Sequence, residues 1–435
     1  KLTDKNISNV SNLGISWQAV IVADGSTATS VEAGKGYFID TTSNAHTVTL
    51  PSSPNAGDTI AIKDYAGTFA TNNLTIARNG HNIQGVANNS LISTNRANVE
   101  LAYIDSTKGW LFTNESNVAD LQQALFVTAT GGTITTVDTN YKVHTFTGDG
   151  CFVVSCGGNP VGSDSVDYLV VAGGGGGGGS AGPDGSGGGG AGGFRTSQTT
   201  IPTGAPPLSN PVNLPVSVQG YPITIGAGSS GATSPPAAGT RGNASIFSSI
   251  TSAGGGAGEG CTAPVPGDAY GNGGSGGGTH QGWACQPYPN TVGFYGNTPP
   301  VSPPQGNNGG DGVTTPNAGG GGGAGGVGSN GSPSISGNGG IGSYVADSWI
   351  GGSAPSYGTP GPVGSSRYFA GGGGGGNSPL RGGQGTISVG GSGGGGGANT
   401  GGSANTGGGG GGAQYPTPNG SAGGSGVVII RYKFQ

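Results

Sequence analysis

The chain has 435 residues, a formal net charge of -5 and only 8% charged residues. Without a basic excess, the composition disfavours nucleic acid and anionic membrane surfaces as partners. No apolar run approaches the ~20 residues needed to span a bilayer, and the opening K-L-T-D-K-N has no hydrophobic signal-peptide core, so membrane insertion is not expected.

Glycine divides the chain into two parts. Few of the 103 glycines precede Cys156, whereas about one residue in three is glycine from Gly157 onward. Disorder is the simplest reading of a part so rich in glycine and proline. Trp283, Trp349 and many Tyr and Phe residues in the same part argue against it, because disordered chains are usually depleted in aromatic residues.

The first part predicts an all-β module. We interpret residues 1–13 as an N-terminal connector and residues 14–115 as a β-rich assembly module. Within the module, short segments alternate apolar and polar residues and are separated by turn sequences. These segments are Trp17–Val22, His46–Leu50, Asp58–Lys63, Asn73–Ala77, Asn98–Ile104 and Gly109–Phe112. The pattern predicts a sandwich or a strand-rich oligomer module.

The next residues lead into the glycine-rich part. Residues 116–130 read as a linker, in which Val118–Leu125 is a candidate short helix. Residues 131–163 predict a β-hairpin module, because Asp149–Gly150 separates two alternating runs. A glycine-rich domain then fills residues 164–435. Strands predicted at Val166–Ala172 and Gly426–Phe434 bracket it, so we expect these two strands to lie together.

Runs of consecutive glycines recur through this domain, beginning with Gly173–Gly179. A run without side chains has no core of its own, but it can form an extended threefold polyglycine II helix whose N–H and C=O groups bond to neighbouring helices. Collagen is excluded, because it requires glycine at every third position with proline between. The sequence predicts a bundle of packed polyglycine II helices with connecting loops, a few closing strands and almost no α-helix. Representative scaffold positions are Gly173, Gly176, Gly179, Gly321, Gly373, Gly395 and Gly409.

Two sets of motifs carry a family resemblance. The chain resembles the glycine-rich domains of bacteriophage tail fibres and adhesins in Val166–Gly179 with Ala191–Arg195, Gly242–Gly258, Tyr368–Gly376 and Gly424–Tyr432. The N-terminal stretches Ala33–Thr42, Thr47–Asp58 and Thr71–Gly80 are similar to β modules of phage tail-fibre and distal tail proteins. Together these stretches extend the resemblance over most of the chain.

The resemblance implies a virion-borne tail protein, assembled in the host cytoplasm and working outside it. Its partners would be other tail proteins and a bacterial surface receptor, either an outer-membrane protein or a glycan. Fibre regions of this kind are commonly homotrimers. In the related tail-tip adhesins, a polyglycine sandwich presents variable loops to the receptor. This chain departs from them by carrying its own β region, which leaves the oligomeric state of the glycine-rich half open.

Aromatic residues between the glycine runs are the candidate receptor contacts. Tyr and Trp with small polar neighbours give a composition like that of an antibody paratope, because rigid amphipathic rings combine with adaptable hydrogen-bonding groups. The alternative is that individual rings cover the bundle as local cores. The candidates are Trp283, Tyr288, Phe294, Tyr295, Tyr344, Trp349, Tyr357 and Tyr415.

Catalytic, cofactor and metal chemistry is not expected. The glycine runs match G-x-G-x-x-G trivially, and the chain contains no G-K-[ST] sequence. The four histidines lack metal-site spacing, and a set of His280, Cys261 and Cys285 is unlike common zinc sites. Glycan cleavage would require paired carboxylates, but the acids of the glycine-rich loops are isolated in sequence. Examples are Glu259, Asp268, Asp311 and Asp347.

The four cysteines fall into two pairs. Cytoplasmic assembly favours buried free thiols for Cys151 and Cys156. A disulfide between Cys261 and Cys285 is as probable as two free thiols.

The sequence as a whole favours a tail-fibre protein that binds a host receptor through loops on a polyglycine scaffold. A purely structural fibre or sheath with the same fold is the main alternative, and an ice-binding bundle is a third.

Overall fold

The computed structural model describes residues 14–117, 124–180, 182, 184–198, 208, 210, 212–233, 237–260, 269–280, 292–313, 317–378 and 388–435. The chain forms two compact units, Lys1–Gln123 and Ala124–Gln435. The expected connector at residues 1–13 lies outside the described residues.

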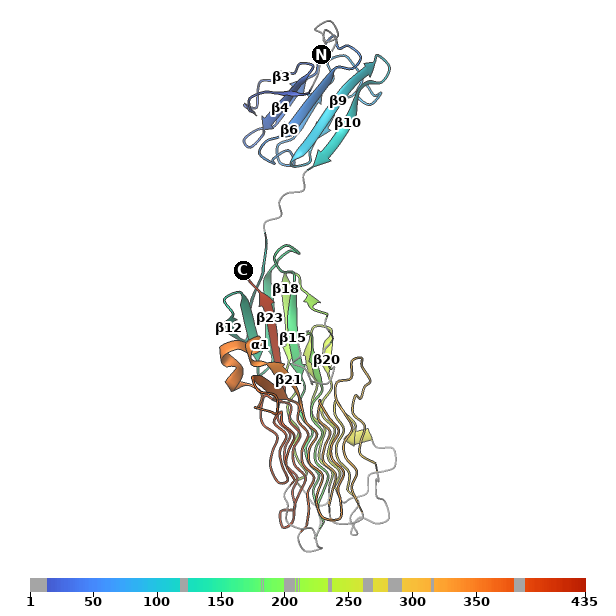
Figure 1. Cartoon of the computed structure of the whole chain (residues 1–435), viewed down its shortest axis with the longest axis vertical. Helices are drawn as coiled ribbons and strands as arrows, with labels where there is room; N and C mark the ends of the chain where they lie inside the picture. The colour runs from blue at the N-terminus through green and yellow to red at the C-terminus, as the bar shows by residue number, and fades with distance from the viewer. Residues whose placement is uncertain are drawn as a thin grey trace, which may run out of the picture. The chain divides into compact units, whose positions relative to one another are not determined.

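Unit 1 is built from two sheets (Figure 1). The first has the order β1-β4-β6-β9-β10, with β2 also paired to β4; its strands are β1 (Ser16–Trp17), β2 (Ile21–Val22), β4 (Lys35–Asp40), β6 (Thr59–Asp64), β9 (Ala97–Asp105) and β10 (Gly109–Asn117). The second has the order β3-β5-β7-β8; its strands are β3 (Thr29–Ser30), β5 (His46–Thr49), β7 (Leu74–Ala77) and β8 (Ser90–Ile92).

Parallel pairing joins successive turns of this unit. Strand β4 pairs with β6, and β5 pairs with β7, so each turn of the chain adds one strand to each sheet. Alternate side chains point to the space between the sheets, which is the reason for the alternating sequence. The fully buried core includes Ile39, Val48, Ile60, Leu101 and Trp110. The prediction of an all-β unit is confirmed.

Unit 2 begins with two further sheets. One has the order β11-β14-β18-β19-β20; its strands are β11 (Val127–Thr130), β14 (Gly150–Gly157), β18 (Gln219–Thr224), β19 (Ser245–Phe247) and β20 (Ile250–Ser252). The other has the order β12-β13-β23-β15-β16, with β17 on β15; its strands are β12 (Thr133–Val137), β13 (Tyr141–Phe146), β23 (Val427–Lys433), β15 (Ser165–Val171), β16 (Phe194–Thr196) and β17 (Leu214–Pro215).

A small hairpin and short helices complete the regular structure of unit 2. They are β21 (Ser343–Ala346) paired with β22 (Ser366–Phe369), the helix α1 (Asp347–Ile350), and the 3-10 helices η2 (Ala269–Gly271) and η4 (Gly351–Ser356). Figure 1 shows α1 beside β12, at the end of the unit that carries the sheets.

Strands β15 and β23 bracket the glycine-rich part and pair antiparallel, with Leu169 opposite Ile429. The expectation that these two segments lie together is confirmed. Both lie in the middle of their sheet, and both faces of that sheet are buried. On β23, Val428 and Ile430 enter the core between the two sheets, whereas Val427 and Ile429 pack under α1 and the β21–β22 hairpin. Burial on both faces explains the continuous apolar run V-V-I-I.

The predicted hairpin at Asp149–Gly150 is wrong. Strands β13 and β14 flank this turn but belong to different sheets, since β13 pairs with β12 and β23 while β14 pairs with β11 and β18. Phe146 and Phe152 both enter the core between the sheets. The turn therefore carries the chain from one layer to the other, and each strand pairs with a distant segment, β13 with β23 and β14 with β18.

Domain boundaries also differ from the predicted ones. Residues 131–163 pair with β11, β18 and β23, so they are part of unit 2 and not a separate module. The region expected as a linker, 116–130, contains the end of β10 and the whole of β11. Most of the candidate helix at Val118–Leu125 lies outside the described residues.

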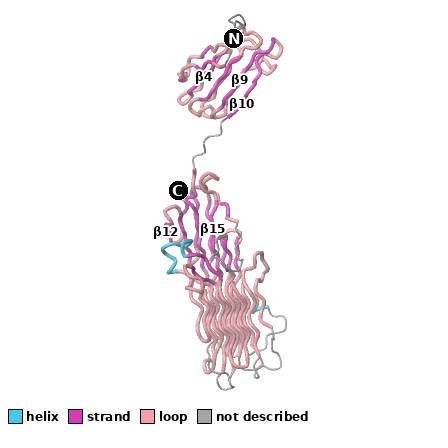
Figure 2. Tube along the Cα trace, in the orientation of Figure 1, coloured by secondary structure: helices cyan, strands magenta, loops and turns pink. Residues whose placement is uncertain are grey.

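The glycine runs form extended segments that run side by side away from the sheets (Figures 1 and 2). The segment Gly173–Gly179 shows the rule: its N–H groups donate to three neighbouring segments with a period of three residues. Gly173, Gly176 and Gly179 bond to residues 237–243, Gly174 and Gly177 to residues 421–424, and Gly175 and Gly178 to residues 187–190. A threefold helix directs successive N–H groups to three sides.

The carbonyl groups of the same segment follow the same period. They accept hydrogen bonds from residues 255–258, 229–232 and 410–413. The segment therefore has six hydrogen-bonded neighbours, three reached by its donors and three by its acceptors. Residues 186–191 likewise have six neighbours. This is a bundle of polyglycine II helices, as predicted, and its hydrogen bonds take the place of a side-chain core.

Candidate functional site

The end of the bundle away from the sheets gathers turns from distant parts of the sequence. We call this the distal end and define it by the turns at residues 332–335, 398–400 and 414–418 together with Asp184 and His280. Figure 2 shows the chain reversing there repeatedly. Backbone bonds tie the turns to the bundle, since Ser180 N donates to Pro418 O at 2.9 Å and Asn399 N donates to Gly412 O at 3.0 Å.

Polar side chains hold the distal turns in place. The N–H of Gln414 donates to Asn399 Oδ1 at 2.8 Å, and Asn399 Nδ2 donates back to Gln414 O at 3.2 Å. Asp311 N similarly donates to Asn330 Oδ1 at 2.9 Å. Sequence reasoning missed these residues. The sequence signal for such residues is an Asn or Asp close to the end of a glycine segment. Its side chain can bond to backbone groups that have no partner within the polyglycine bundle.

A buried polar layer lies just beneath these turns. Asp184, Glu259 and His280 are each at most 2% exposed, although each belongs to a polar residue type. The backbone N–H of His280 donates to Glu259 Oε2 at 2.8 Å. Burial lowers the pKa of His280 to about 4, partly offset by the nearby charge of Asp184. The imidazole is therefore neutral at pH 7 and forms part of the interior of the scaffold.

Among the candidate aromatic contacts, two are exposed in the described structure. Tyr415 is 36% exposed and lies in the distal turn 414–418. Tyr295 is 60% exposed, but it lies on the flank of the bundle, where its N–H donates to Asn272 Oδ1 at 2.9 Å. Trp283 and Tyr288 lie outside the described residues.

Two other candidates are buried, so their side chains cannot form part of an exposed contact surface. Tyr344 and Trp349 are 2% and 3% exposed, at the end of the unit that carries the sheets. Tyr344 packs against Tyr368 with ring centroids 4.8 Å apart, and Trp349 belongs to the core beneath α1. The composition of these segments could not distinguish buried rings from exposed ones, because aromatic residues also form local cores.

The remaining candidates are partly buried. Phe294 packs edge-to-face on Tyr270, with ring centroids 5.0 Å apart, on the flank of the bundle. Tyr357 packs against the core beneath α1. These two rings pack as parts of local cores, which fits the structure better than a role in contacting a receptor.

The proposed scaffold glycines all lie inside the bundle, where their missing side chains allow close approach. At six of them, an added Cβ would lie 2.0–2.1 Å from a carbonyl oxygen of a neighbouring segment, and at Gly179 it would lie 2.9 Å from the Cβ of Ala232. Real Cβ atoms essentially never approach backbone so closely. The six are Gly173, Gly176, Gly321, Gly373, Gly395 and Gly409.

Cysteine and acidic residues form no reactive centre in the described ranges. Cys151 and Cys156 are free thiols, but Cys151 is exposed on β14, so the prediction that both are buried is wrong. Cys261 and Cys285 lie outside the described residues. No group of three or more potential metal ligands occurs among the residues that the structure describes. Asp347 begins α1 at the end of unit 2 that carries the sheets, whereas Asp311 lies at the distal end. These two carboxylates therefore do not form a pair.

Family comparison agrees with this architecture. A family described as a glycine-rich domain matches residues 154–433, which is more than half of the chain. The chain belongs to this glycine-rich domain family. A second family, described as the N-terminal part of bacteriophage T4 gp9/10-like proteins, matches residues 7–118. The predicted relation to phage tail-fibre proteins is confirmed, and the chain is a phage tail protein.

The two matches divide the tail protein much as its structure does. The T4 gp9/10-like match covers unit 1, and the glycine-rich match covers most of unit 2. The T4 gp9/10-like match indicates a place in the virion and interaction with other tail proteins. A search of curated proteins found no match. Within the described ranges, none of the helices has the length and apolar character that a membrane crossing requires.

Proposed function

We propose that this tail protein binds a receptor on the bacterial surface through the distal end of its polyglycine bundle. The observation that carries the proposal is the gathering of turns from separate parts of the sequence at one end of a rigid scaffold. Binding residues concentrate in loops that a rigid framework positions. The bundle depends on hydrogen bonds between backbone groups. The sequence of a distal turn can therefore change without disturbing the bundle beneath it.

The distal turns have a composition suited to recognition. Asn399, Gln414 and Thr417 present polar groups, and Tyr415 adds an exposed amphipathic ring. Such rings bury large area at low cost in conformational entropy. Binding would be non-covalent and without turnover, and the receptor would be an outer-membrane protein or a glycan. Unit 1 would serve assembly with other tail proteins, in a fibre that we propose to be a homotrimer.

Cell binding by the labelled full chain tests the proposal. Changing both Tyr415 and Thr417, which are exposed in the distal turn 414–418, to Ala is expected to reduce binding to a panel of bacterial cells at least ten-fold. The matched control is Tyr295→Ala, which removes an exposed tyrosine from the flank and should leave binding unchanged. Equal binding by the double variant and the control would refute a distal receptor surface. A folded chain that binds no cells would favour a purely structural fibre or sheath.

A further inference from the structure

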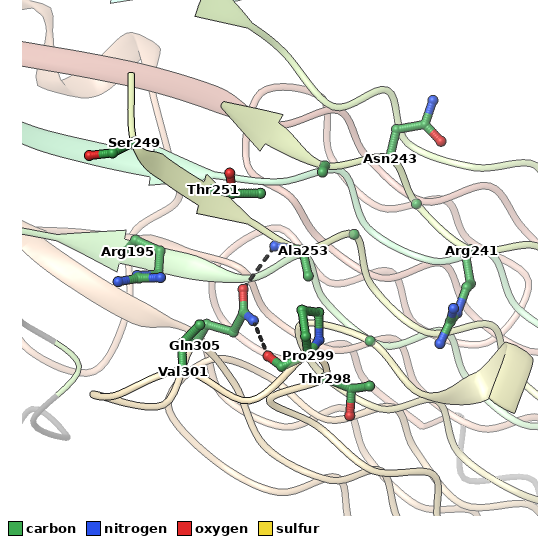
Figure 3. A pocket seen from close by; sticks show the side chains of 14 residues that line it. Arg195, Arg241, Asn243, Ser249, Thr251, Ala253, Thr298, Pro299, Val301 and Gln305 are labelled. Carbon is green, nitrogen blue, oxygen red and sulfur yellow. Dashed lines mark hydrogen bonds between the residues drawn. The ribbon is translucent and has the colours of Figure 1, made fainter. Parts of the chain in front are cut away.

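A cavity of about 570 Å³ opens on the flank of unit 2, where the sheets meet the bundle. Its walls come from β16, from the segment 241–244, from the turn and strand around β20, and from residues 298–305 (Figure 3). All of these are described residues. The volume lies within the range of roughly 300–1,000 Å³ that is typical of small-ligand sites.

Among the described residues of the lining, two arginines supply the only formal charges. Arg195 lies on β16 between the buried residues Phe194 and Thr196, so its side chain points away from the core on the alternating strand. Its side chain is half-buried and makes no hydrogen bond or ion pair with any described residue. A guanidinium carries five donors, and partial burial without partners leaves them poorly satisfied.

Arg241 is fixed by the backbone on the other side of the cavity. Its Nε donates to Tyr270 O at 3.2 Å, and its Nη2 donates to Asn272 O. Partial burial lowers the pKa of Arg241, although the residue as a whole is exposed. Figure 3 shows Arg195 and Arg241 at opposite sides, with Gln305 and Pro299 between them. No carboxylate occurs among the described residues that line the cavity, so the electrostatic field of the two arginines favours an anion.

The rest of the lining is uncharged and combines polar side chains with glycine and small apolar residues. Gln305 is held at both ends of its amide, since Ala253 N donates to Oε1 at 2.8 Å and Nε2 donates to Pro299 O at 3.0 Å. Ser249 and Thr251 add hydroxyl groups at the rim. A fixed wall of this kind does not need to be ordered when a ligand binds, which reduces the cost of binding.

We propose that this cavity binds an anionic saccharide, with the guanidinium of Arg195 contacting its phosphate or carboxylate group. Guanidinium forms a fork that matches both groups, and the surrounding hydroxyl and amide groups suit sugar hydroxyls. The volume accommodates a ring in addition to the anion. This site lies on the flank, away from the distal turns, and does not rest on their proposed role.

Titration calorimetry on the full chain tests the site with four probes: glucose 6-phosphate, glucuronic acid, glucose and inorganic phosphate. We expect both anionic sugars to bind, and to bind more tightly than glucose or inorganic phosphate. Arg195→Gln should weaken binding of the anionic sugars at least ten-fold, the loss expected for one charge-assisted contact. The matched control Lys433→Gln removes one exposed positive charge from the same unit and should change nothing.

Thr251→Tyr provides a second test that leaves the charge unaltered. The larger side chain would fill the rim of the cavity and should abolish binding while the melting temperature of unit 2 stays unchanged. Unaltered affinity in both Arg195→Gln and Thr251→Tyr would overturn the proposal. Equal affinity for inorganic phosphate and the anionic sugars would overturn the saccharide assignment, and no binding of any anionic sugar would overturn the site. Cell binding of Arg195→Gln separates this result from the distal proposal, which predicts no loss.

Discussion

Replacing one glycine inside the bundle tests whether backbone contact is the basis of its stability. Gly321→Ala would place a Cβ 2.0 Å from the carbonyl oxygen of Gly189 and 2.5 Å from its carbonyl carbon. Ordinary contact begins near 3.4 Å, so the two segments would have to separate by more than 1 Å. No side chain can rotate away, because the atoms met belong to a backbone that is bonded on all sides.

The separation would strain identifiable hydrogen bonds. Gly321 N donates to Gly373 O at 2.8 Å, and Gly189 N donates to Gly410 O at 2.8 Å. Two such bonds contribute about 1 kcal/mol each, and overpacking typically costs about 1–3 kcal/mol. Alanine recovers ~0.4–1 kcal/mol by restricting the unfolded chain. The expected net loss in the free energy of unfolding of unit 2 is therefore on the order of 3 kcal/mol.

Scanning calorimetry of the full chain measures this loss as a fall in the melting temperature of unit 2. The expected fall is roughly 6 °C or more, at about 2 °C per kcal/mol for a unit of this size. Gly148→Ala is the matched control, because an added Cβ there meets nothing within 4 Å. It should leave the melting temperature unchanged or slightly raised. The same melting temperature for Gly321→Ala and Gly148→Ala would refute the backbone-contact argument.

Two further predictions concern buried side chains. The pKa of His280 is about 4 in the folded chain and about 6.5 when unfolded, so the unfolded state binds the additional proton between these values. Unit 2 should therefore lose stability as the pH falls from about 6.5 to about 4, and chemical denaturation should show a weaker pH dependence for His280→Gln; equal dependence would contradict this. Trp349→Ala should lower the free energy of unfolding by about 3–5 kcal/mol, because the ring fills a core. Trp349→Phe should cost less, and a loss of cell binding at unchanged stability in either variant would contradict the core assignment.

Local sequence predicted the elements whose physics is local. Continuous glycine runs predict polyglycine II helices, because only a residue without a Cβ allows backbones to approach as closely as Gly189 and Gly321 do. The V-V-I-I run predicts a strand, and its position at the end of the glycine-rich part predicts that it lies beside β15. These predictions need only the residues of one segment, or the order of two segments along the chain.

Tertiary structure alone decided which segments become neighbours and which rings stay exposed. Strands β13 and β14 read as a hairpin, but competition among all available partners placed them in different layers. Tyr344 and Tyr415 are both predicted as receptor contacts from their composition, yet one is buried and the other lies on a distal turn. Arg195 gives no sequence signal, because its cavity is formed by segments up to 110 residues further along the chain. Composition thus determined the kind of scaffold, whereas exposure and the flank cavity depend on long-range packing, which no single segment encodes.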